Sequence, residues 1–374
     1  MRIKSICWLY KILYGGVEAR AEHLADYLST NHEVELIYAR TIRGMLSKHG
    51  GGHGFKHKEL NIFFNPYRVY SKRFWEEYFI SRATRYIRSC RDKTDIVDGQ
   101  GINAIPGIRA GLPTVTTVHG TRLWVGNNVG KLEKETLEKA DKIIATTKHT
   151  KQELVDSGVT DEKICVIYNG VDLIQIQEVK VEKSGLLRKY QLNPDKKVIL
   201  SVHNFDRVKN TKLAIDSFNS FNHGDYQLVF IGHGYEEPVH KKYVLSNNIK
   251  DVYFLGRLSQ SEVYKFYKGS ELFLLPSLRE SWGTVFVEAM AAGCPVVLSN
   301  QCGITEAIQD MKEVIIVDPY SCDEIKKGIE KVFASKDLRD NLTGNGLEFA
   351  RALSWENQGR LLENELIKVL NSRN

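Results

Sequence analysis

Short apolar segments alternate with amphipathic segments along the whole chain, and this alternation constrains the fold more than any other feature of the sequence. The segments expected to form strands are IKSICWL, EVELIYA, DIVDG, TVTTVH, KIIATT and KICVIY in the first half, and KKVILSV, YQLVFIG, DVYFLG, LFLLP, PVVLS and EVIIV in the second. Strands that alternate with helices are typical of parallel sheets covered by helices on both faces. Two such series, each long enough for its own sheet, predict an α/β protein with two Rossmann-like domains.

The regular pattern is interrupted once, after the segment IYNGVD at 167–172, where a polar connector begins. We therefore expect an N-terminal domain over 1–172, a linker over 173–195 and a C-terminal domain over 196–354. The final segment, 355–374, has a strongly helical pattern. In two-domain α/β proteins the ligand binds at the C-terminal ends of the strands, in the cleft between the domains.

Charge is distributed unevenly between the two halves. Residues 1–172 contain 26 Lys and Arg against 20 Asp and Glu, whereas residues 173–374 contain 26 of each. A basic first half indicates an anionic partner, which could be a phosphorylated acceptor, a membrane surface or a nucleic acid. Lys4 and Lys11 interrupt the apolar N-terminal segment, which favours a first strand over a signal peptide, and no segment is long enough to span a membrane. We expect a cytoplasmic protein.

The motifs of several protein classes are missing from the sequence. The six cysteines are scattered without a C-x-x-C pair, which favours reduced thiols over a structural zinc site. Neither a G-x-G-x-x-G segment after the first strand nor a P-loop is present, which disfavours nicotinamide enzymes, flavin enzymes and P-loop kinases. The segments GQG at 99–101 and GHG at 232–234 are weak signals by themselves.

A histidine-rich segment, HGGGHGFKH, places His49, His53 and His57 four positions apart. On a helix this spacing would align three metal ligands. Three consecutive glycines disfavour a helix, so we expect a loop and assign no metal.

The following segment, 55–93, is rich in aromatic and basic residues. At helical spacing it has an apolar stripe of Trp75, Phe79, Ala83 and Tyr86 and a basic face of Arg82, Arg85 and Arg88. This pattern fits a helix packed on the core with a solvated basic side. It also fits a surface that meets anionic lipid or a phosphorylated acceptor. No nucleic-acid recognition motif accompanies the charges.

Two glutamates, Glu280 and Glu288, lie eight positions apart in the segment RESWGTVFVEAMAAGCPVV. Glu280 precedes a Gly-containing turn, and Glu288 lies in an apolar segment that has the pattern of a helix. Carboxylates placed in this way could bind a metal, act as an acid/base pair or hold the hydroxyls of a sugar.

Several segments, in order along nearly the whole chain, together resemble glycosyltransferase family 4. They are YGGVEARAEHLADYLSTNHEVELIY, GLPTVTTVHG, EKADKIIATTKHTKQELVDSGVTDEKICVIYNGVD, FLGRLS, and RESWGTVFVEAMAAGCPVVLS followed by CGITEAI. The two glutamates match the E-x7-E motif of that family. The resemblance implies the GT-B fold: two Rossmann-like domains face each other across a deep cleft, and the C-terminal helix crosses back to the N-terminal domain. It also implies an acceptor site in the N-terminal domain and a nucleotide-sugar site in the C-terminal domain.

The first half contributes two candidate sites to this resemblance. Gly15 and Gly16 follow the first strand and precede a helix, where open amides let an anion or a sugar approach. The resemblance implies contact with the donor phosphate or the acceptor. His119 ends a strand, where its imidazole can donate a hydrogen bond to a sugar hydroxyl or a developing oxyanion. The resemblance implies a role for His119 beside the reacting sugar.

The donor pyrophosphate needs fixed positive charge, because the leaving group gains charge as the glycosidic bond breaks. The family supplies an arginine, and a lysine five residues later, after the first strand of the second domain. In SVHNFDRVKN, Lys209 occupies the lysine position, whereas Asn204 stands where the arginine is expected. We expect Arg207 to reach the phosphate instead, since a guanidinium fork suits it. Without that substitution the chain would be a weak enzyme or a non-catalytic paralogue.

The remaining donor contacts come from the second half. Glu280 is expected to accept hydrogen bonds from the transferred sugar, and Glu288 from the ribose hydroxyls. The amides of the helix start would lie near the donor sugar and phosphate; these belong to Ser281, Trp282, Gly283 and Thr284. Backbone groups of Gly256, Arg257 and Leu258 are expected against the nucleotide base.

The resemblance therefore implies a retaining hexosyltransferase that moves a sugar from a UDP-, GDP- or ADP-linked donor to a hydroxyl acceptor, which would be a glycan, a glycolipid or a lipid-linked precursor. We expect no cofactor and no tightly bound metal, in agreement with the lack of a D-x-D-type pair between a strand and a turn. We expect a cytoplasmic location, with a peripheral contact to an anionic membrane through the basic half as a further expectation. The alternatives are a GT-B epimerase or phosphorylase, and a non-catalytic nucleotide-sugar-binding paralogue.

Overall fold

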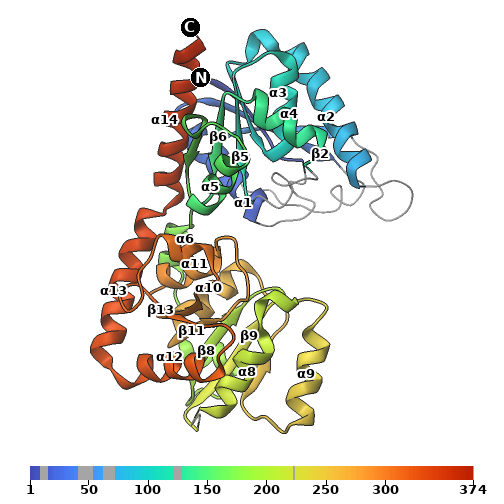
Figure 1. Ribbon diagram of the computed structural model, residues 1–374. Helices are drawn as coiled ribbons and strands as arrows, with labels where there is room; N and C mark the ends of the chain where they lie inside the picture. Colours follow the sequence, from blue (N-terminus) through green and yellow to red (C-terminus); the bar gives the residue numbers. More distant parts are fainter. Residues whose placement is uncertain (9–15, 41–53, 62–71, 121–128, 222–223, 374) are drawn as a thin grey trace. The chain divides into compact units, whose positions relative to one another are not determined.

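The computed structural model describes residues 1–8, 16–40, 54–61, 72–120, 129–221 and 224–373 (Figure 1). The chain forms two compact units. The first unit consists of Met1–Gly170 together with Trp355–Asn374, and the second unit is Val171–Ser354. Residues 173–195, where we expected a linker, contribute two helices to the second unit: α6 (Leu173–Glu178) and α7 (Lys183–Lys189).

The described part of the first unit contains a seven-stranded parallel sheet in the order β3-β2-β1-β4-β5-β6-β7. Its strands are β1 (Arg2–Ile6), β2 (Glu33–Arg40), β3 (Lys56–Asn61), β4 (Ile96–Gln100), β5 (Thr114–Val118), β6 (Lys142–Ala145) and β7 (Ile164–Val166). The six strands expected in this half are confirmed. The edge strand β3 was not predicted, because its sequence KHKELN has no apolar run and Leu60 is the only buried residue among those of the strand whose burial is described, Lys56 to Leu60. An edge strand can carry charged side chains because one of its sides is open to solvent.

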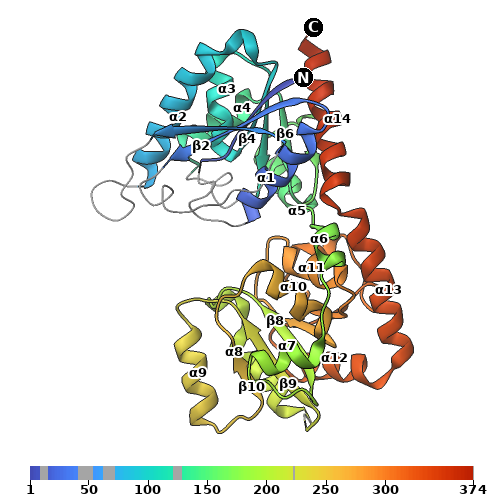
Figure 2. The ribbon, with the colours of Figure 1, turned by 180° about the vertical axis from the view of Figure 1, so that it is seen from behind.

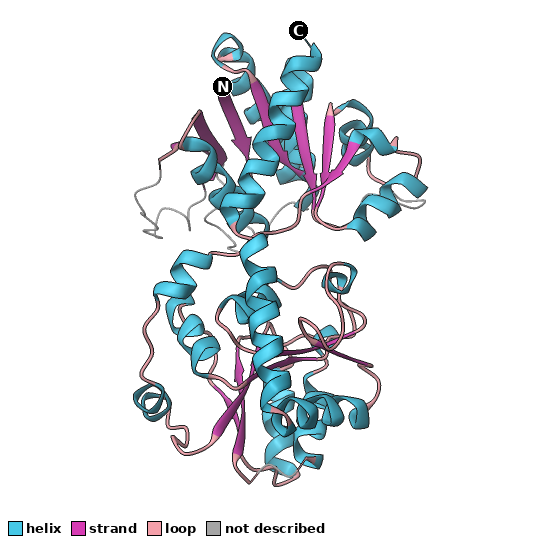
Figure 3. Cartoon of the chain, turned by 90° about the vertical axis from the view of Figure 1, so that its left-hand side faces the viewer, coloured by secondary structure: helices cyan, strands magenta, loops and turns pink. Residues whose placement is uncertain are grey.

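Helices cover both faces of this sheet (Figures 1 and 3). They are α1 (Gly16–Ser29), α2 (Lys72–Ser89), α3 (Ile105–Ala110), α4 (Lys131–Lys139), α5 (Lys148–Asp156) and α14 (Trp355–Arg373). On α2 the predicted apolar stripe packs against the core, where Phe79 and Ala83 are fully buried and Trp75 and Tyr86 partly buried.

The C-terminal helix α14 belongs to the first unit, as expected, and lies beside α1 (Figure 2). A Cβ at Gly359 would lie 2.3 Å from the Tyr27 ring, so the glycine permits the close approach of the two helices. A hydrogen bond of 2.6 Å between His32, just after α1, and Glu363 of α14 joins the two segments. Leu362 and Leu366 of α14 are fully buried in the core of the first unit.

The described part of the second unit contains a six-stranded parallel sheet in the order β10-β9-β8-β11-β12-β13. Its strands are β8 (Lys197–Val202), β9 (Tyr226–Ile231), β10 (Val252–Phe254), β11 (Leu272–Leu275), β12 (Val296–Ser299) and β13 (Ile315–Val317), all of which were expected. The helices are α8 (Thr211–Ser220), α9 (Glu237–Ser246), α10 (Gln260–Gly269), α11 (Thr284–Ala291), α12 (Cys322–Ala334) and α13 (Lys336–Ala352), besides α6 and α7.

All six cysteines are free thiols, as the lack of paired spacing predicted. Within the described ranges, no helix combines the length and apolar character needed to cross a membrane.

Candidate active site

Lys209 and Glu280 meet in the second unit, beyond the carboxyl ends of β8 and β11. Lys209 ends the short 3-10 helix Arg207–Lys209, and its ammonium donates a hydrogen bond to the Glu280 carboxylate. A backbone hydrogen bond of 2.7 Å from Leu278 N to Val208 O joins the two loops that carry these side chains. Two predicted donor-binding residues that are 71 positions apart in the chain therefore form one ion pair.

The backbone of Glu280 is held on both sides by the loop after β12. Its N–H donates to Gln301 O at 3.3 Å, and its carbonyl accepts from Gly303 N at 2.8 Å. A Cβ at Gly303 would lie 1.9 Å from Ser281 O, so the approach of the two segments requires glycine there. These contacts fix the direction in which the Glu280 side chain leaves the turn.

Asn210, which was not among the predicted site residues, connects the loops around this pair. Its backbone adopts the left-handed conformation at φ 57°, and its amide donates to Pro276 O at 3.1 Å and to Pro319 O at 2.7 Å. Those carbonyls follow β11 and β13. Asparagine tolerates the left-handed conformation better than most residues, but the two distant partners of this side chain are not visible in the sequence.

The N-terminus of α11 follows directly after the Glu280 turn. Gly283 precedes the helix with φ 87°, and no side chain caps the first amides. Uncapped amides and the helix dipole make such a terminus suited to an anion. Ser281 is exposed and Thr284 half-buried, whereas the Trp282 side chain is only 3% exposed, so a ligand would meet Trp282 through its backbone.

Glu288 lies about one turn into α11 and is hydrogen-bonded to two side chains from α10. Its carboxylate accepts from the Tyr267 hydroxyl at 3.1 Å and from the Gln260 amide at 3.2 Å. Burial raises the pKa of Glu288 to about 7, while the two hydrogen bonds act in the opposite direction and Asp172 adds a smaller increase. Each carboxylate oxygen of Glu288 accepts one of these hydrogen bonds, so the side chain is oriented to accept two donors at once.

The segment expected against the base, Gly256 to Leu258, follows β10. Gly256 has φ 71° and its carbonyl accepts from Gly232 N at 2.9 Å, while Arg257 is exposed and Leu258 half-buried. Gly232 belongs to the GHG segment, which was a weak signal in the sequence. A Cβ on Gly232 would lie 1.8 Å from His203 O, so this glycine lets the loops after β8 and β9 touch.

Among the described residues, no hydrogen bond or ion pair joins the side chain of Asn204 or Arg207 to the Lys209–Glu280 pair. The Asn204 side chain is exposed. The Arg207 side chain is 84% exposed, and its Nε lies 3.2 Å from the Glu236 carboxylate. The guanidinium is thus held loosely at the surface, because an exposed ion pair of this kind is worth about 0–1 kcal/mol.

In the first unit, His119 follows β5 and bonds to the last residue of β4. Its Nε2 lies 2.8 Å from Oε1 of Gln100, which can only accept, so Nε2 carries the proton and Nδ1 remains as the acceptor. Burial lowers the pKa of His119 to about 3, with a further decrease from the Arg20 charge, so the ring is neutral at physiological pH. Gly16 is exposed at the start of α1, whereas Gly15 lies outside the described residues.

Within the ranges that the structure describes, no group of three or more His, Cys, Asp or Glu side chains is arranged to hold a metal ion. His57 lies in the edge strand β3. The other two histidines of that segment, His49 and His53, lie outside the described residues.

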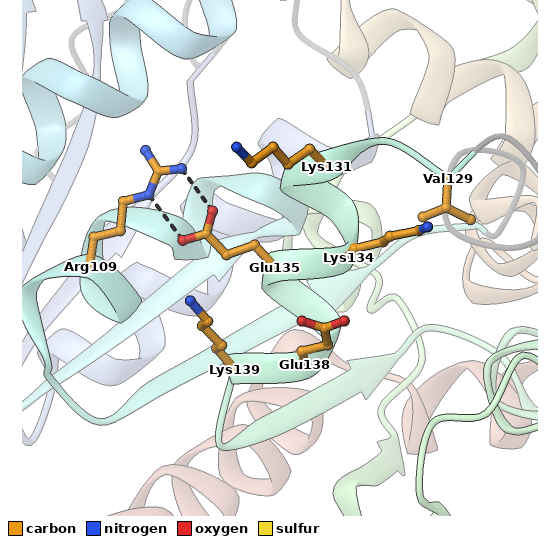
Figure 4. A pocket seen from close by; sticks show the side chains of 7 residues that line it. All are labelled: Arg109, Val129, Lys131, Lys134, Glu135, Glu138 and Lys139. Carbon is orange, nitrogen blue, oxygen red and sulfur yellow. Dashed lines mark hydrogen bonds and ion pairs between the residues drawn. The ribbon is translucent and has the colours of Figure 1, made fainter.

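A depression of about 620 Å³ lies on the outer helices of the first unit, beside α3 and α4 (Figure 4). Its lining carries charges of both signs, and Arg109 makes a two-bond contact with Glu135 at 2.7 and 3.1 Å across it. None of the predicted site residues lines this depression. It is therefore separate from both parts of the candidate site.

Two parallel-sheet α/β units of this topology, with ligand-binding candidates at the carboxyl ends of the strands, define the GT-B class of glycosyltransferase folds. The model of "Glycosyltransferase Family 4" matches residues 14–175, and the model of "Glycosyl transferases group 1" matches residues 183–349. The chain belongs to glycosyltransferase family 4.

Individual proteins agree with this assignment. An uncharacterized glycosyltransferase of Methanocaldococcus jannaschii is 28% identical over 68% of each chain. N-acetyl-alpha-D-glucosaminyl L-malate synthase of Bacillus anthracis is 30% identical over 52% of this chain and 51% of the relative. Anabaena HepE, solved in complex with UDP and glucose, has a TM-score of 0.76 at 17% identity and covers 98% of this chain and 100% of its own, a likeness that shows the fold.

Proposed function

We propose that this protein is a retaining glycosyltransferase that moves a hexosyl unit from a nucleotide diphosphate sugar to a hydroxyl acceptor. The observation that carries the proposal is the Lys209–Glu280 pair beside the uncapped N-terminus of α11. This arrangement offers a cation and open amides for a diphosphate, next to a carboxylate for sugar hydroxyls. HepE, which shares the fold, was solved in complex with UDP-glucose, and the relative from Bacillus anthracis is named as a synthase of N-acetyl-alpha-D-glucosaminyl L-malate.

On binding to the second unit, the donor diphosphate would replace Glu280 as the ion-pair partner of Lys209. The diphosphate takes the Lys209 ammonium and the first amides of α11, which compensate the charge that develops on the leaving group. Glu280 is then free to accept hydrogen bonds from the transferred sugar. Glu288 accepts the two ribose hydroxyls in place of Gln260 and Tyr267, and backbone groups around Gly256 meet the base.

Arg207 is proposed as the second phosphate contact, in the role expected of an arginine at Asn204. To reach the phosphate, the exposed Arg207 side chain would break its ion pair with Glu236, the one ion pair it makes among the described residues. A charge-assisted hydrogen bond to a phosphate is stronger than an exposed ion pair. In the first unit, His119 would accept a hydrogen bond at Nδ1 from a sugar hydroxyl.

The proposed chemistry needs no resident metal, because Lys209, Arg207 and the α11 terminus supply the positive charge that the leaving diphosphate requires. Departure of the diphosphate and attack of the acceptor hydroxyl would occur on one face of the sugar, which retains the anomeric configuration. The departing phosphate oxygen would take the proton of the acceptor hydroxyl.

The test is a donor assay with the full chain. Release of nucleotide diphosphate is measured for UDP-, GDP- and ADP-sugars, with and without glycan, glycolipid and lipid-linked acceptors, and the product anomer is read by NMR. We expect release with one donor class and a product with the anomeric configuration of the donor. An inverted product contradicts retention, a freed epimer identifies an epimerase, and the lack of release with every donor identifies a binding paralogue.

We also propose that the enzyme works in the cytoplasm in peripheral contact with an anionic membrane. Phe74 and Tyr78 are 44% and 40% exposed on α2, and the exposed Arg82 and Arg85 continue the same face at helical spacing. Exposed aromatic rings next to basic side chains suit a bilayer interface with acidic headgroups. We expect cosedimentation with vesicles containing phosphatidylglycerol and not with phosphatidylcholine alone, and its loss in the Phe74→Ser, Tyr78→Ser double variant. Equal binding of that variant contradicts the contact.

A further inference from the structure

Another depression, of about 340 Å³, lies on the outer helices of the first unit, where α2 packs against α3. Three arginines line it, and no acidic side chain is among the described residues of its lining, which are Ser81, Thr84, Arg85, Arg88 and Arg109. The volume falls in the range of about 300–1,000 Å³ that is usual for small-molecule sites. We call these five residues the arginine depression.

The helical period of α2 brings most of these side chains together. Ser81, Arg85 and Arg88 follow one another at steps of four and three positions, so they lie along one face of the helix. Thr84 is buried beside them, and its hydroxyl donates to Ile80 O at 2.7 Å. Arg109 joins the lining from the last turn of α3. The arginines therefore converge from two packed helices on one concave region.

Two of the three guanidinium groups are held in place by contacts within the unit. Arg88 Nη2 donates to Arg109 O at 2.8 Å, and so satisfies a carbonyl at the end of α3. The Arg109 side chain makes two hydrogen bonds to Glu135 of α4, at 2.7 and 3.1 Å (Figure 4). A side chain that is already ordered loses less conformational entropy when a ligand binds.

The positive charge of the depression is only partly neutralised. Glu135 pairs with Arg109, and Glu77 adds a smaller attraction to the same guanidinium. Within the described ranges, Arg85 makes no hydrogen bond or ion pair, and Arg88 has no acidic partner. Two guanidinium groups are thus available to an anion, and their forked donors match the oxygens of a phosphate.

The arginine depression is separate from the candidate site at the carboxyl ends of the strands. Arg88 and Arg109 lie in the last turns of α2 and α3, the helices that precede β4 and β5. Helices that connect parallel strands run back toward the start of the next strand, so the depression lies toward the amino ends of β4 and β5. His119 follows the carboxyl end of β5. A ligand in the depression would not touch a sugar bound beside His119.

We propose that the arginine depression binds a phosphate monoester, at a site apart from those of the donor and the acceptor. Such a group carries a charge of about −1.5 to −2 at pH 7, which matches the two available guanidinium charges better than a single carboxylate does. Arg85 and Arg88 donate to its oxygens, and the exposed Ser81 hydroxyl adds a neutral donor. A soluble phosphate ester and the headgroup of phosphatidic acid present the same chemistry, and the experiment separates these two sources.

The experiment titrates the full chain with inorganic phosphate and glycerol 3-phosphate, and follows the Nε–H signals of Arg85 and Arg88 by NMR. These signals belong to the depression, so phosphate bound near Lys209 does not contribute to the result. We expect saturable shifts, and an affinity about tenfold weaker for acetate at equal ionic strength, because a carboxylate pairs with fewer of the donors. Equal shifts with acetate overturn the proposal.

Arg85→Gln tests the site without disturbing a contact, since Arg85 makes none among the described residues. We expect it to weaken glycerol 3-phosphate binding about tenfold and to leave thermal stability unchanged. Arg360→Gln is the matched control, because it removes the same charge from an exposed position on α14 of the same unit. Equal weakening in both variants shows general electrostatic attraction only and overturns the proposal, as does a loss of stability in Arg85→Gln with unchanged binding.

Arg88→Gln and vesicles distinguish the two sources of phosphate. For a soluble ligand, Arg88→Gln weakens glycerol 3-phosphate binding and leaves cosedimentation with phosphatidic acid vesicles unchanged. For a lipid headgroup, the variant loses cosedimentation with phosphatidic acid and keeps the binding to phosphatidylglycerol that is proposed for Phe74 and Tyr78, so failure of that membrane contact is seen separately. An Arg88→Gln variant that retains both glycerol 3-phosphate and phosphatidic acid binding overturns the proposal.

Discussion

Lys209 and Glu280 form an ion pair across two loops of the second unit, so the cation proposed to bind the phosphate contacts the carboxylate proposed to bind the sugar. Both side chains are mostly buried, at 16% and 18% exposed, and neither has another ion-pair partner among the described residues. In the proposed donor complex Lys209 would exchange its ion pair with Glu280 for one with the diphosphate, and the freed Glu280 carboxylate would be compensated by hydrogen bonds from sugar hydroxyls.

Replacing this lysine should remove donor turnover. For Lys209→Met we expect kcat/KM to fall by about two to three orders of magnitude, because a charge aimed at the leaving group stabilises the transition state by a few kcal/mol. The matched control is Lys212→Met, whose lysine is 59% exposed and pairs with Asp216 one turn along α8. Steady-state kinetics checks both, and equal losses in the two variants would contradict a specific role for Lys209.

The affinity for the donor nucleotide should depend on the protonation of Glu288. Because burial raises the pKa of this carboxyl to about 7, it gains the negative charge that accepts two ribose hydroxyls only as the pH rises through that value. We expect UDP affinity, measured by calorimetry, to increase between pH 6 and pH 8. Glu288→Gln should bind more weakly and lose this dependence, whereas a variant that keeps the native pH profile rules out Glu288 as its origin.

The same carboxyl should affect stability with a defined sign. Its pKa is about 7 in the folded chain against 4.5 as the ordinary value, so the folded state holds the proton more tightly between these two values. The contribution of Glu288 to the free energy of unfolding is therefore fully present below about pH 4.5 and is lost as the pH rises through 7. Urea unfolding at pH 5 and pH 8 should show a smaller loss of stability for Glu288→Gln than for the native chain; an identical loss would argue against the shift.

Arg207 can be tested against the position that it is proposed to replace. Arg207→Ala should reduce donor turnover at least tenfold with little change in thermal stability, since the side chain is 84% exposed. Adding Asn204→Arg to this variant should restore part of the turnover. Unchanged turnover of Arg207→Ala would contradict the hypothesis that Arg207 takes the role of the arginine expected at position 204. The double variant shows whether an arginine at position 204 can reach the phosphate.

Gly303 should be intolerant of any side chain. A Cβ there would meet Ser281 O at 1.9 Å, so Gly303→Ala must displace the turn that directs Glu280. We expect a destabilisation of about 1–3 kcal/mol together with loss of turnover. Gly344→Ala is the control, because nothing lies within 4 Å of its added Cβ and it lies inside α13, where alanine should stabilise by about 0.5–1 kcal/mol.

The strands were predictable from the sequence because each buried strand of a parallel sheet has its own apolar run. The edge strand β3 was missed for the opposite reason, since Lys56 pairs with Glu33 in solvent and, from Lys56 to Leu60, Leu60 alone is buried. The helix α2 was predictable from the stripe of Trp75 and Phe79, because burial follows the helical period.

Within the candidate site, the sequence indicated residues but not their partners. Lys209 and Glu280 were both candidates, yet their contact depends on the packing of two loops. Tyr267, which bonds to Glu288, lies on a different helix and carries no local signal of that role. The buried position of Arg20 was likewise invisible, because an arginine in an amphipathic helix is usually solvated.

The return of α14 also determines when each unit can form during synthesis. The core of the first unit contains Leu362, Leu366 and Val369, which are made only after the whole of the second unit has been translated. The second unit can fold as its own residues emerge, whereas in the first unit the apolar surface of α1 and the sheet that α14 covers stays exposed until α14 has been made. A chain that stops before α14 would thus leave that apolar face available to chaperones and proteases.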